Sequence, residues 1–283
     1  MDDKDQKREI DRLNAEVRRL RGMLRELTPP LPAMLRRRGF RIYKKEPKDD
    51  LLIPVQQHLD GYYEMLKRYS FRLFLRDVIK HQPVFTLTQA TRYATKEVTG
   101  QYITYLCDIG LVAPDDSAFR LTTGPIKSFG ETLEWFLAEI FRREFSSEAI
   151  WGVKMKRPLV GGDYDLLAKL EGSILYMEVK SSPPRQIYQN EISAFVDRVL
   201  DLLPALALFF EDTELRMKDK IVPMFAEEMT SRSLTGDIVR VERELFEVTG
   251  PWPAGMRVFI INAKDSIIQN IETVLSRFFR REA

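Results

Sequence analysis

Residues 161–182 read GGDYDLLAKLEGSILYMEVKSS, and this stretch says more about the fold than any other part of the sequence. Apolar residues dominate positions 163–170 and 173–179, and a Glu-Gly pair at 171–172 separates them. Short apolar runs on either side of a glycine-containing turn are typical of two antiparallel strands. We therefore expect a β-hairpin here, with charged residues carried inside its strands.

The charged residues of this hairpin are expected to meet. Side chains alternate between the two faces of a strand. The pattern therefore predicts that Asp163 and Asp165 share one face and that Tyr164 and Leu166 share the other. Glu178 and Lys180 also share a face, and pairing across the turn brings Asp165 near both. A buried pair of carboxylates beside a lysine is costly unless a divalent cation neutralises the carboxylates. The lysine can then orient an attacking water.

The flanking sequence predicts an α/β domain with a mixed sheet flanked by helices. A helix with one apolar face is expected over 131–145, and a further strand over 150–155. After the hairpin, the pattern predicts a covering helix, two strands and a closing helix, at 188–203, 205–210, 256–265 and 266–281. Packing these helices on the sheet makes an α/β sandwich.

A helix bearing a glutamate, then an aspartate in one strand, then Glu-x-Lys in the next is an order that resembles the PD-(D/E)xK nuclease superfamily. The fold of that superfamily is restriction-endonuclease-like. The resemblance covers residues 127–184 well and the remainder loosely. It assigns Asp165 to the first half of the motif, and Glu178 and Lys180 to the (D/E)xK half.

Two further positions bear on this resemblance. Glu134, in GETLEW, fits the acidic residue that many members place on the preceding helix, and Glu131, one turn away, is the alternative. Tyr164 stands where the name-giving proline would be, a proline that many members lack. The resemblance therefore leaves the acidic helix residue open between two glutamates.

The resemblance implies a phosphodiester hydrolase that depends on Mg²⁺ or Mn²⁺. Asp165 would bridge the ion or ions, and Glu178 and the main-chain carbonyl of Val179 would complete the inner ligands. Glu134 would hold a second ion or its water. Lys180 would polarise the attacking water and offset charge in the transition state.

Residues 56–126 resemble a winged helix-turn-helix module. Helices are expected over 56–81, 87–94 and 96–109, and GLVAPDDSAFRLT after them predicts a hairpin around an Asp-Asp turn. In that family the third helix enters the major groove of DNA. The resemblance implies DNA contacts by residues of the last helix and phosphate contacts by two arginines beside them: Lys96, Thr99, Gln101 and Tyr102, with Arg92 and Arg120. Modules of this kind also bind proteins, and that alternative stays open.

The first 55 residues predict two further segments. Over residues 1–28 the apolar positions Ile10, Leu13, Val17, Leu20, Leu24 and Leu27 follow a heptad spacing. This spacing favours a short two-stranded coiled coil and therefore a homodimer, and the alternative is an amphipathic helix folded back on its own chain. Residues 29–55 combine prolines with the basic runs at 36–38 and 44–45 around a short strand-like GFRIY (39–43), which indicates a linker or a small docking segment.

The composition narrows the possible chemistry. One Cys and two His among 283 residues cannot build a four-ligand zinc site within one chain, so a metal would be held by carboxylates. Residues 1–127 carry a formal net charge of +7 and residues 128–283 of −5, which together give +2. The basic front half favours an anionic partner. A charged N-terminus and the lack of an apolar run of about 18 residues favour a cytoplasmic protein without a membrane span.

We expect a dimeric DNA nuclease in which residues 127–283 cut and residues 56–126 position the substrate. One alternative is a non-catalytic DNA-binding or regulatory protein that retains the nuclease fold as a scaffold. In a third interpretation, the winged helix and coil dock a protein partner that delivers the nuclease. The choice between DNA and RNA, the strandedness and specificity of the substrate, endonuclease or exonuclease action, and the pathway stay open.

Overall fold

A computed structural model of the chain describes residues 29–156 and 160–280, together with seven positions between 12 and 23. Within the expected coiled coil, Leu13, Val17 and Leu20 are helical and exposed. The other heptad positions lie outside the described residues, so the coil and the homodimer stay predictions. Among the described residues, no helix combines the length and the apolar character needed to cross a membrane.

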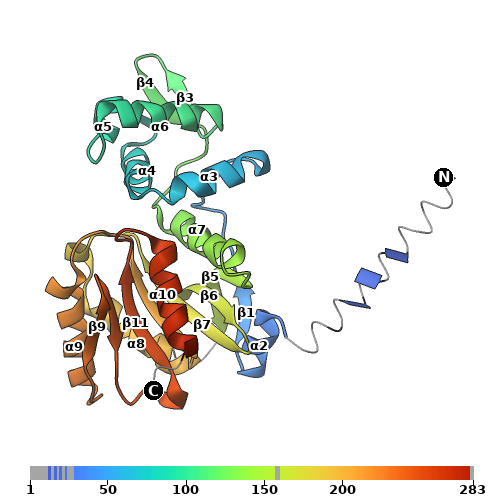
Figure 1. The fold of residues 1–283 in the computed structure, drawn as a ribbon. Coiled ribbons are helices and arrows are strands. Elements are labelled where there is room, and N and C mark those ends of the chain that lie inside the picture. Colours follow the sequence, from blue (N-terminus) through green and yellow to red (C-terminus); the bar gives the residue numbers. More distant parts are fainter. Residues whose placement is uncertain are drawn as a thin grey trace.

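The described residues form a mixed eight-stranded sheet with strand order β1-β5-β6-β7-β8-β11-β10-β9 (Figure 1). The strands in that order are Arg41–Lys44, Ala149–Lys156, Asp163–Leu170, Ser173–Lys180, Leu206–Glu211, Arg257–Asn262, Leu245–Val248 and Ile238–Glu242. β8 runs parallel to both β7 and β11, and the other neighbours are antiparallel. The mixed sheet and the expected hairpin, now β6 and β7, are confirmed.

Helices cover both faces of this sheet (Figure 1). On one face lie α7 (Gly130–Arg143) and α10 (Ile267–Arg280), and on the other α8 (Gln189–Leu202) and α9 (Ile221–Ser231). Each face has its own hydrophobic core, because alternate residues of a buried strand point to opposite sides. We call these cores the α7 side and the α8 side of the sheet. Within residues 29–156 and 160–280, four short 3-10 helices lie in the connections: Gln56–His58, Pro184–Gln186, Met217–Asp219 and Pro253–Gly255.

A smaller helical unit precedes the sheet domain. It contains α3 (Leu59–Leu66), α4 (Tyr69–His81), α5 (Leu87–Ala90) and α6 (Lys96–Asp108), then the hairpin of β3 (Val112–Asp115) and β4 (Ala118–Leu121). The single helix expected over 56–81 is wrong, because Arg68 is extended and separates α3 from α4. The short strand β2 (Val84–Phe85) pairs with β4 and was not expected. The unit thus has four helices before the hairpin where three are expected, and the winged-helix family itself stays a prediction.

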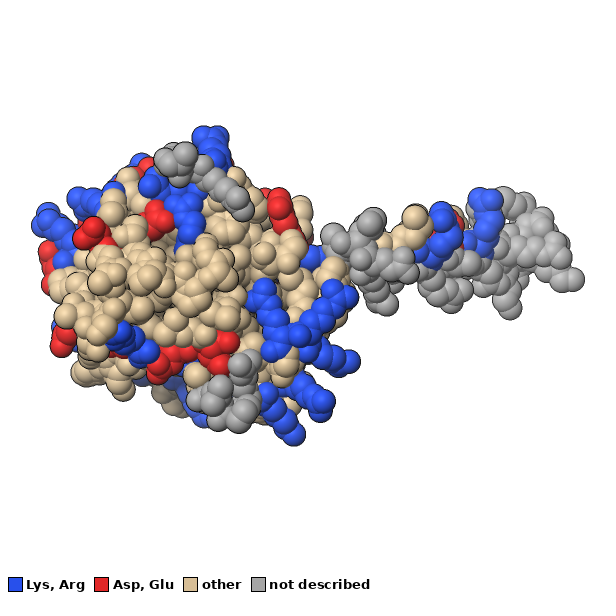
Figure 2. Space-filling view, turned by 90° about the horizontal axis from the view of Figure 1, so that it is seen from below, with Lys and Arg blue, Asp and Glu red and all other residues tan. Residues whose placement is uncertain are grey.

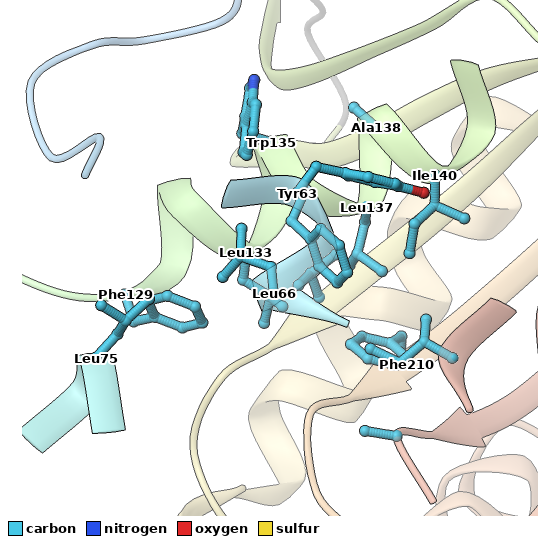
Figure 3. Close-up of a cluster of buried hydrophobic side chains, with 14 of the residues drawn as sticks. Tyr63, Leu66, Leu75, Phe129, Leu133, Trp135, Leu137, Ala138, Ile140 and Phe210 are labelled. Carbon is cyan, nitrogen blue, oxygen red and sulfur yellow. The ribbon is translucent and has the colours of Figure 1, made fainter. Parts of the chain in front are cut away.

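The helical unit and the sheet share one core through α7 (Figure 3). Tyr63 and Leu66 of α3 lie against α7, where Leu133 and Leu137 are fully buried, and Phe210 of β8 lies on the sheet side. The contact is therefore a continuous hydrophobic interior rather than a polar interface between separate bodies.

The segment over residues 29–55, expected as a linker or a small docking segment, packs on the sheet domain over its first half. Residues Leu31 and Leu35 of α2 (Leu31–Arg37) and Phe40 are buried in the core of the α8 side. β1 then pairs with β5, with Ile42 opposite Met155. Burial of these apolar residues is the reason why the segment becomes an edge of the main sheet.

Candidate active site

Asp165 lies at a break in the side-chain alternation of β6. Tyr164 packs on the α8 side of the sheet and Leu166 on the α7 side, so the expectation that they share a face is wrong. The neighbouring strand β5 breaks at the same level, because Trp151 and Val153 also lie on opposite sides of the sheet.

Gly152 explains this break. Its φ is +56°, a backbone conformation that glycine adopts at little cost. A Cβ atom at this position would come within 2.8 Å of Cγ of Pro47. The missing side chain therefore permits a local twist in β5 next to Asp165, and Asp165 is turned toward the edge of the ladder.

The hydrogen-bonded pairing of β6 with β7 ends next to Asp165. The last paired residues are Leu166 and Met177, and beyond them the Asp165 carboxylate accepts the main-chain N–H of Val179 at 2.7 Å. A side chain thus takes the place of a strand hydrogen bond. The two strands part at this point, and Asp165 lies beside Glu178 and Lys180 as the sequence predicts.

Glu178 is the most enclosed member of the group, with 2% of its surface exposed. Arg198 of α8 donates to both carboxylate oxygens at 2.7 and 2.8 Å, and the Tyr176 hydroxyl donates to one of them. Lys180 forms an ion pair with Glu178 at 3.0 Å and another with Glu191 at 3.1 Å. The charge of Glu178 is therefore balanced within the protein.

Glu134 rather than Glu131 faces the group. An added Cβ on Gly152 would lie 3.6 Å from Oε2 of Glu134, which places that carboxylate beside the break in β5. The Glu131 carboxylate instead accepts the main-chain N–H of Asp50 at 3.0 Å. Glu131 thus stabilises the segment that precedes α3. Glu134 is therefore the better candidate for the acidic helix residue.

The electrostatics of the group are those of crowded carboxylates. Burial and the charge of Glu178 raise the pKa of Asp165 to about 8, although the Val179 N–H and Lys180 oppose the rise. Burial and the charge of Asp165 raise the pKa of Glu134 well above its usual range. Burial lowers the pKa of Lys180, but Glu178 and Asp165 outweigh it, so the net pKa is raised and the amine stays protonated at neutral pH.

A second ion-pair cluster holds the helical unit against the end of β8. Arg72 of α4, 1% exposed, donates to the Asp212 carboxylate through Nε at 2.9 Å and through Nη2 at 2.8 Å. Arg76 also pairs with Asp212. The main-chain N–H of Asp212 donates to the carbonyl of Lys180 at 2.8 Å. This cluster therefore fixes the backbone of Lys180 from the other side of the sheet.

Sequence reasoning missed Arg198 and Arg72, although the helical pattern contained a signal for both. Arg198 lies three residues after Phe195 and four before Leu202, on the apolar face of its helix. Arg72 lies three residues before the buried Leu75. A cation on an apolar helix face indicates a buried carboxylate partner, because an unpaired buried charge is costly.

A pocket of about 750 Å³ reaches Ser181, the residue after Lys180. Its lining combines apolar residues such as Ile126 and Phe129 with the cations Arg76, Lys80 and Lys127. The pocket lies between the end of α4 and the start of α7, where the helix dipole of α7 adds positive potential. The positive potential of this pocket suits an anionic group.

The expected DNA-contact residues divide into two sets. Thr99 is fully buried, and Tyr102 is 4% exposed with its hydroxyl 2.8 Å from that of Ser70. Both lie on the face of α6 that packs against α4, so as contact residues they are corrected to core residues. The exposed side chains are those of Arg92, Lys96, Gln101 and Arg120.

The donor set fits a hard divalent cation in part. Asp165 and Glu134 repel one another, and a cation between carboxylates would relieve that repulsion. Glu178 already gives both oxygens to Arg198. Among the described residues, no group of three or more His, Cys, Asp or Glu side chains is gathered closely enough to hold a metal ion.

Comparison with known proteins gives a likeness in fold. No family model matches the sequence, and the search of curated proteins returns no match. Protein VC1899 from Vibrio cholerae is a structural neighbour with 12% identity and a TM-score of 0.50, over 89% of this chain and 62% of that one. Can2 from Sulfobacillus thermosulfidooxidans, solved in complex with cyclic tetra-adenylate, has 12% identity and a TM-score of 0.51, over 87% of this chain and 60% of that one. The chain thus spans less than two thirds of each neighbour, and it is similar to both in fold.

Proposed function

We propose that the protein is a metal-dependent nuclease that hydrolyses phosphodiester bonds in DNA. One observation carries the proposal: Asp165, Glu134 and a protonated Lys180 gather where β6 and β7 part, in the order along the chain that PD-(D/E)xK nucleases use. A break in strand pairing that is occupied by repelling carboxylates and a half-buried cation costs stability. Such costs are typical of functional sites.

Mg²⁺ or Mn²⁺ would supply the positive charge that stabilises a pentavalent phosphate. Asp165 and Glu134 would hold it, since no arginine in the described part of the chain forms an ion pair with either carboxylate. Glu178 and the carbonyl of Val179 are the further ligands that the family resemblance assigns. To serve as one, Glu178 would have to share its oxygens with Arg198.

Lys180 has the clearest role among the protein groups. Its pKa is raised, so it acts as a cation that orients the attacking water and offsets charge on the phosphate, rather than as a base that removes a proton. Its ion pairs with Glu178 and Glu191 fix the direction of the amine. Arg198 is a positioning residue, because it acts on Glu178 and not on the substrate.

The helical unit would position the nucleic acid. Exposed Lys96 and Gln101 on α6 are the proposed groove contacts, and Arg92 and Arg120 the proposed phosphate contacts. The pocket beside Ser181 lies between the helical unit and the candidate site. A nucleic-acid strand bound to the helical unit would therefore pass this pocket on its way to the site. The alternative for this surface is a protein partner that delivers the nuclease, and the homodimer through residues 1–28 stays a prediction.

The bidentate Arg198–Glu178 pair favours a second candidate function. A site whose central glutamate is neutralised by an arginine resembles a structural ion pair, as in a DNA-binding or regulatory protein that retains the fold as a scaffold. The two functions differ in one outcome, because the scaffold would bind DNA without cutting it.

The experiment is incubation of the purified chain with supercoiled, linear, branched and single-stranded DNA, and with RNA, each with Mg²⁺, Mn²⁺ or a chelator. Cleavage of DNA that requires the metal supports the nuclease. Binding of DNA without cleavage under every metal condition supports the scaffold, and cleavage of RNA alone would correct the substrate.

A further inference from the structure

A strongly basic surface lies at the β1 edge of the main sheet, away from the proposed groove contacts on α6. We name it the basic edge and define it by seven side chains from α2, β1, β5 and the turn after β1: Arg36, Arg37, Arg41, Lys44, Lys45, Lys154 and Lys156. Six are exposed and Lys154 is half-buried. Figure 2 shows Lys and Arg side chains gathered beside the point where the N-terminal segment joins the body, which is the place of α2 in Figure 1.

The strand register places like charges directly opposite each other on this edge. Arg41 pairs with Lys156, and Lys44 pairs with Lys154. Like charges at directly opposed positions destabilise a sheet. The fold therefore keeps a local repulsion here that an anionic partner would remove.

Acidic neighbours neutralise only part of the charge. Lys44 forms an ion pair with Asp49 at 3.1 Å, and Lys154 forms one with Asp163 at 3.0 Å. Within the described part of the chain, Arg37, Arg41, Lys45 and Lys156 have no ion pair closer than 4.0 Å. The unneutralised cations thus outnumber the neutralised ones.

The basic edge is continuous with the part of the candidate active site that lies on the α7 side of the sheet, whereas Glu178 and Lys180 point to the α8 side, where they pair with Arg198 and Glu191. Ile42 and Met155 pack on the α8 side, so their strand neighbours Lys154 and Lys156 point to the α7 side. Glu134 reaches the sheet from that side. The partner of Lys154 is Asp163, two residues before Asp165. A chain of cations therefore begins next to the carboxylates and runs outward along β5 and β1.

We propose that the basic edge binds the phosphate backbone of the nucleic acid next to the bond that is cut. This inference rests on the proposed function and adds a substrate-binding surface to it, separate from the groove contacts of α6. Flexible, exposed lysines and arginines on strand faces neutralise phosphates without reading bases, so binding here is independent of sequence and falls as salt rises.

The test compares two fourfold variants with the wild type. The first carries Arg37→Gln, Arg41→Gln, Lys45→Gln and Lys156→Gln. The control carries Arg68→Gln, Arg216→Gln, Lys218→Gln and Arg280→Gln, which remove the same charge from exposed positions elsewhere. Both must keep the circular-dichroism spectrum and melting temperature of the wild type. Fluorescence anisotropy with labelled duplex and single-stranded oligonucleotides, in chelator and over a series of salt concentrations, measures binding without cleavage.

Each lost phosphate contact lowers the slope of log affinity against log salt by about 0.9 on duplex or about 0.7 on single-stranded DNA. The basic-edge variant should therefore lose roughly a hundredfold or more in affinity at low salt, and the control should lose much less. Equal losses in the two variants would overturn the inference, and so would wild-type binding to anionic lipid vesicles but not to oligonucleotides. Salt-dependent binding through the edge without any metal-dependent cleavage would contradict the proposed nuclease and leave the edge as a phosphate-binding surface of a protein that does not cut.

Discussion

The buried ion pair between Arg72 and Asp212 offers a quantitative test of how the helical unit is joined to the site. Both side chains are at most 1% exposed, and the guanidinium also donates to the carbonyl of Leu66 at 2.6 Å. The perturbation is Arg72→Met, which keeps an unbranched apolar stem and removes the guanidinium with its charge and all its hydrogen bonds. The matched change on the other side is Asp212→Asn, which keeps shape and removes charge.

The expected magnitude follows from the burial. Removal of one partner from a buried pair costs about 3–5 kcal/mol, because the other charge is left without compensation. In Arg72→Met the Asp212 carboxylate keeps Arg76, whose side chain is 19% exposed, so we expect about 3 kcal/mol. The double variant should lose less stability than the sum of the losses of the two single variants. The reason is that the second substitution removes a charge whose partner the first has already removed.

The pH dependence of the unfolding free energy provides an independent test of the ion pair. Burial raises the pKa of Asp212, but Arg72 and Arg76 lower it by more, so the pKa in the folded state is below the ordinary value. A carboxyl of this kind stabilises the fold above its unfolded pKa of about 3.9, and this contribution is lost as the pH falls through the folded pKa. The difference in unfolding free energy between wild type and Asp212→Asn should therefore be full at neutral pH and shrink in acid.

Urea unfolding followed by tryptophan fluorescence gives the free energies, at neutral pH and in acid. The reasoning is refuted if Arg72→Met unfolds at the same urea concentration as the wild type. It is equally refuted if the losses of the single variants add in the double variant, or if the effect of Asp212→Asn grows as the pH falls.

Three further outcomes are expected. Gly152→Ala should lose about 2–4 kcal/mol of stability, because alanine at φ +56° is strained and its Cβ would press on Pro47, and a chemical melt that matches the wild type would contradict this. Deletion of residues 1–28 should convert a dimer to a monomer in light scattering, and a truncated protein that stays dimeric would place the interface elsewhere. Arg92→Ala with Lys96→Ala should lower the salt slope of duplex binding by roughly 1.8, and an unchanged slope would point to a protein-docking role for α6.

The sequence was informative wherever apolar periodicity and charge occurred in the same short segment. The hairpin of β6 and β7 could be predicted, because its two runs are separated by one turn and pairing is local. The proximity of Asp165 to Glu178 and Lys180 follows from that pairing. The break at Asp165 could not be predicted, because it depends on the positive φ of Gly152 in a different strand.

Elements with mixed signals were harder to predict. In α9 a proline stands at position 223, in the first turn of the helix, where its missing N–H costs nothing but interrupts the sequence pattern. β9 is an edge strand with exposed polar residues and no continuous apolar run. β1 has four residues, of which Arg41 and Lys44 are charged, and the burial of Leu35, Phe40 and part of Ile42 holds it in place. For α9 and β9 the tertiary contact, and not the local sequence, determines the structure.

The most direct test of the nuclease is cleavage of plasmid DNA by wild type, Lys180→Ala and Asp165→Ala, measured beside calorimetric titration with Mg²⁺ on the same preparations. The wild type should bind the ion and cut. Lys180→Ala should still bind the ion and cut about 100- to 10,000-fold more slowly, because the water is no longer oriented. Asp165→Ala should lose both properties and remain folded. A wild type that binds neither Mg²⁺ nor Mn²⁺, or a Lys180→Ala variant that cuts as fast as the wild type, would contradict the nuclease mechanism.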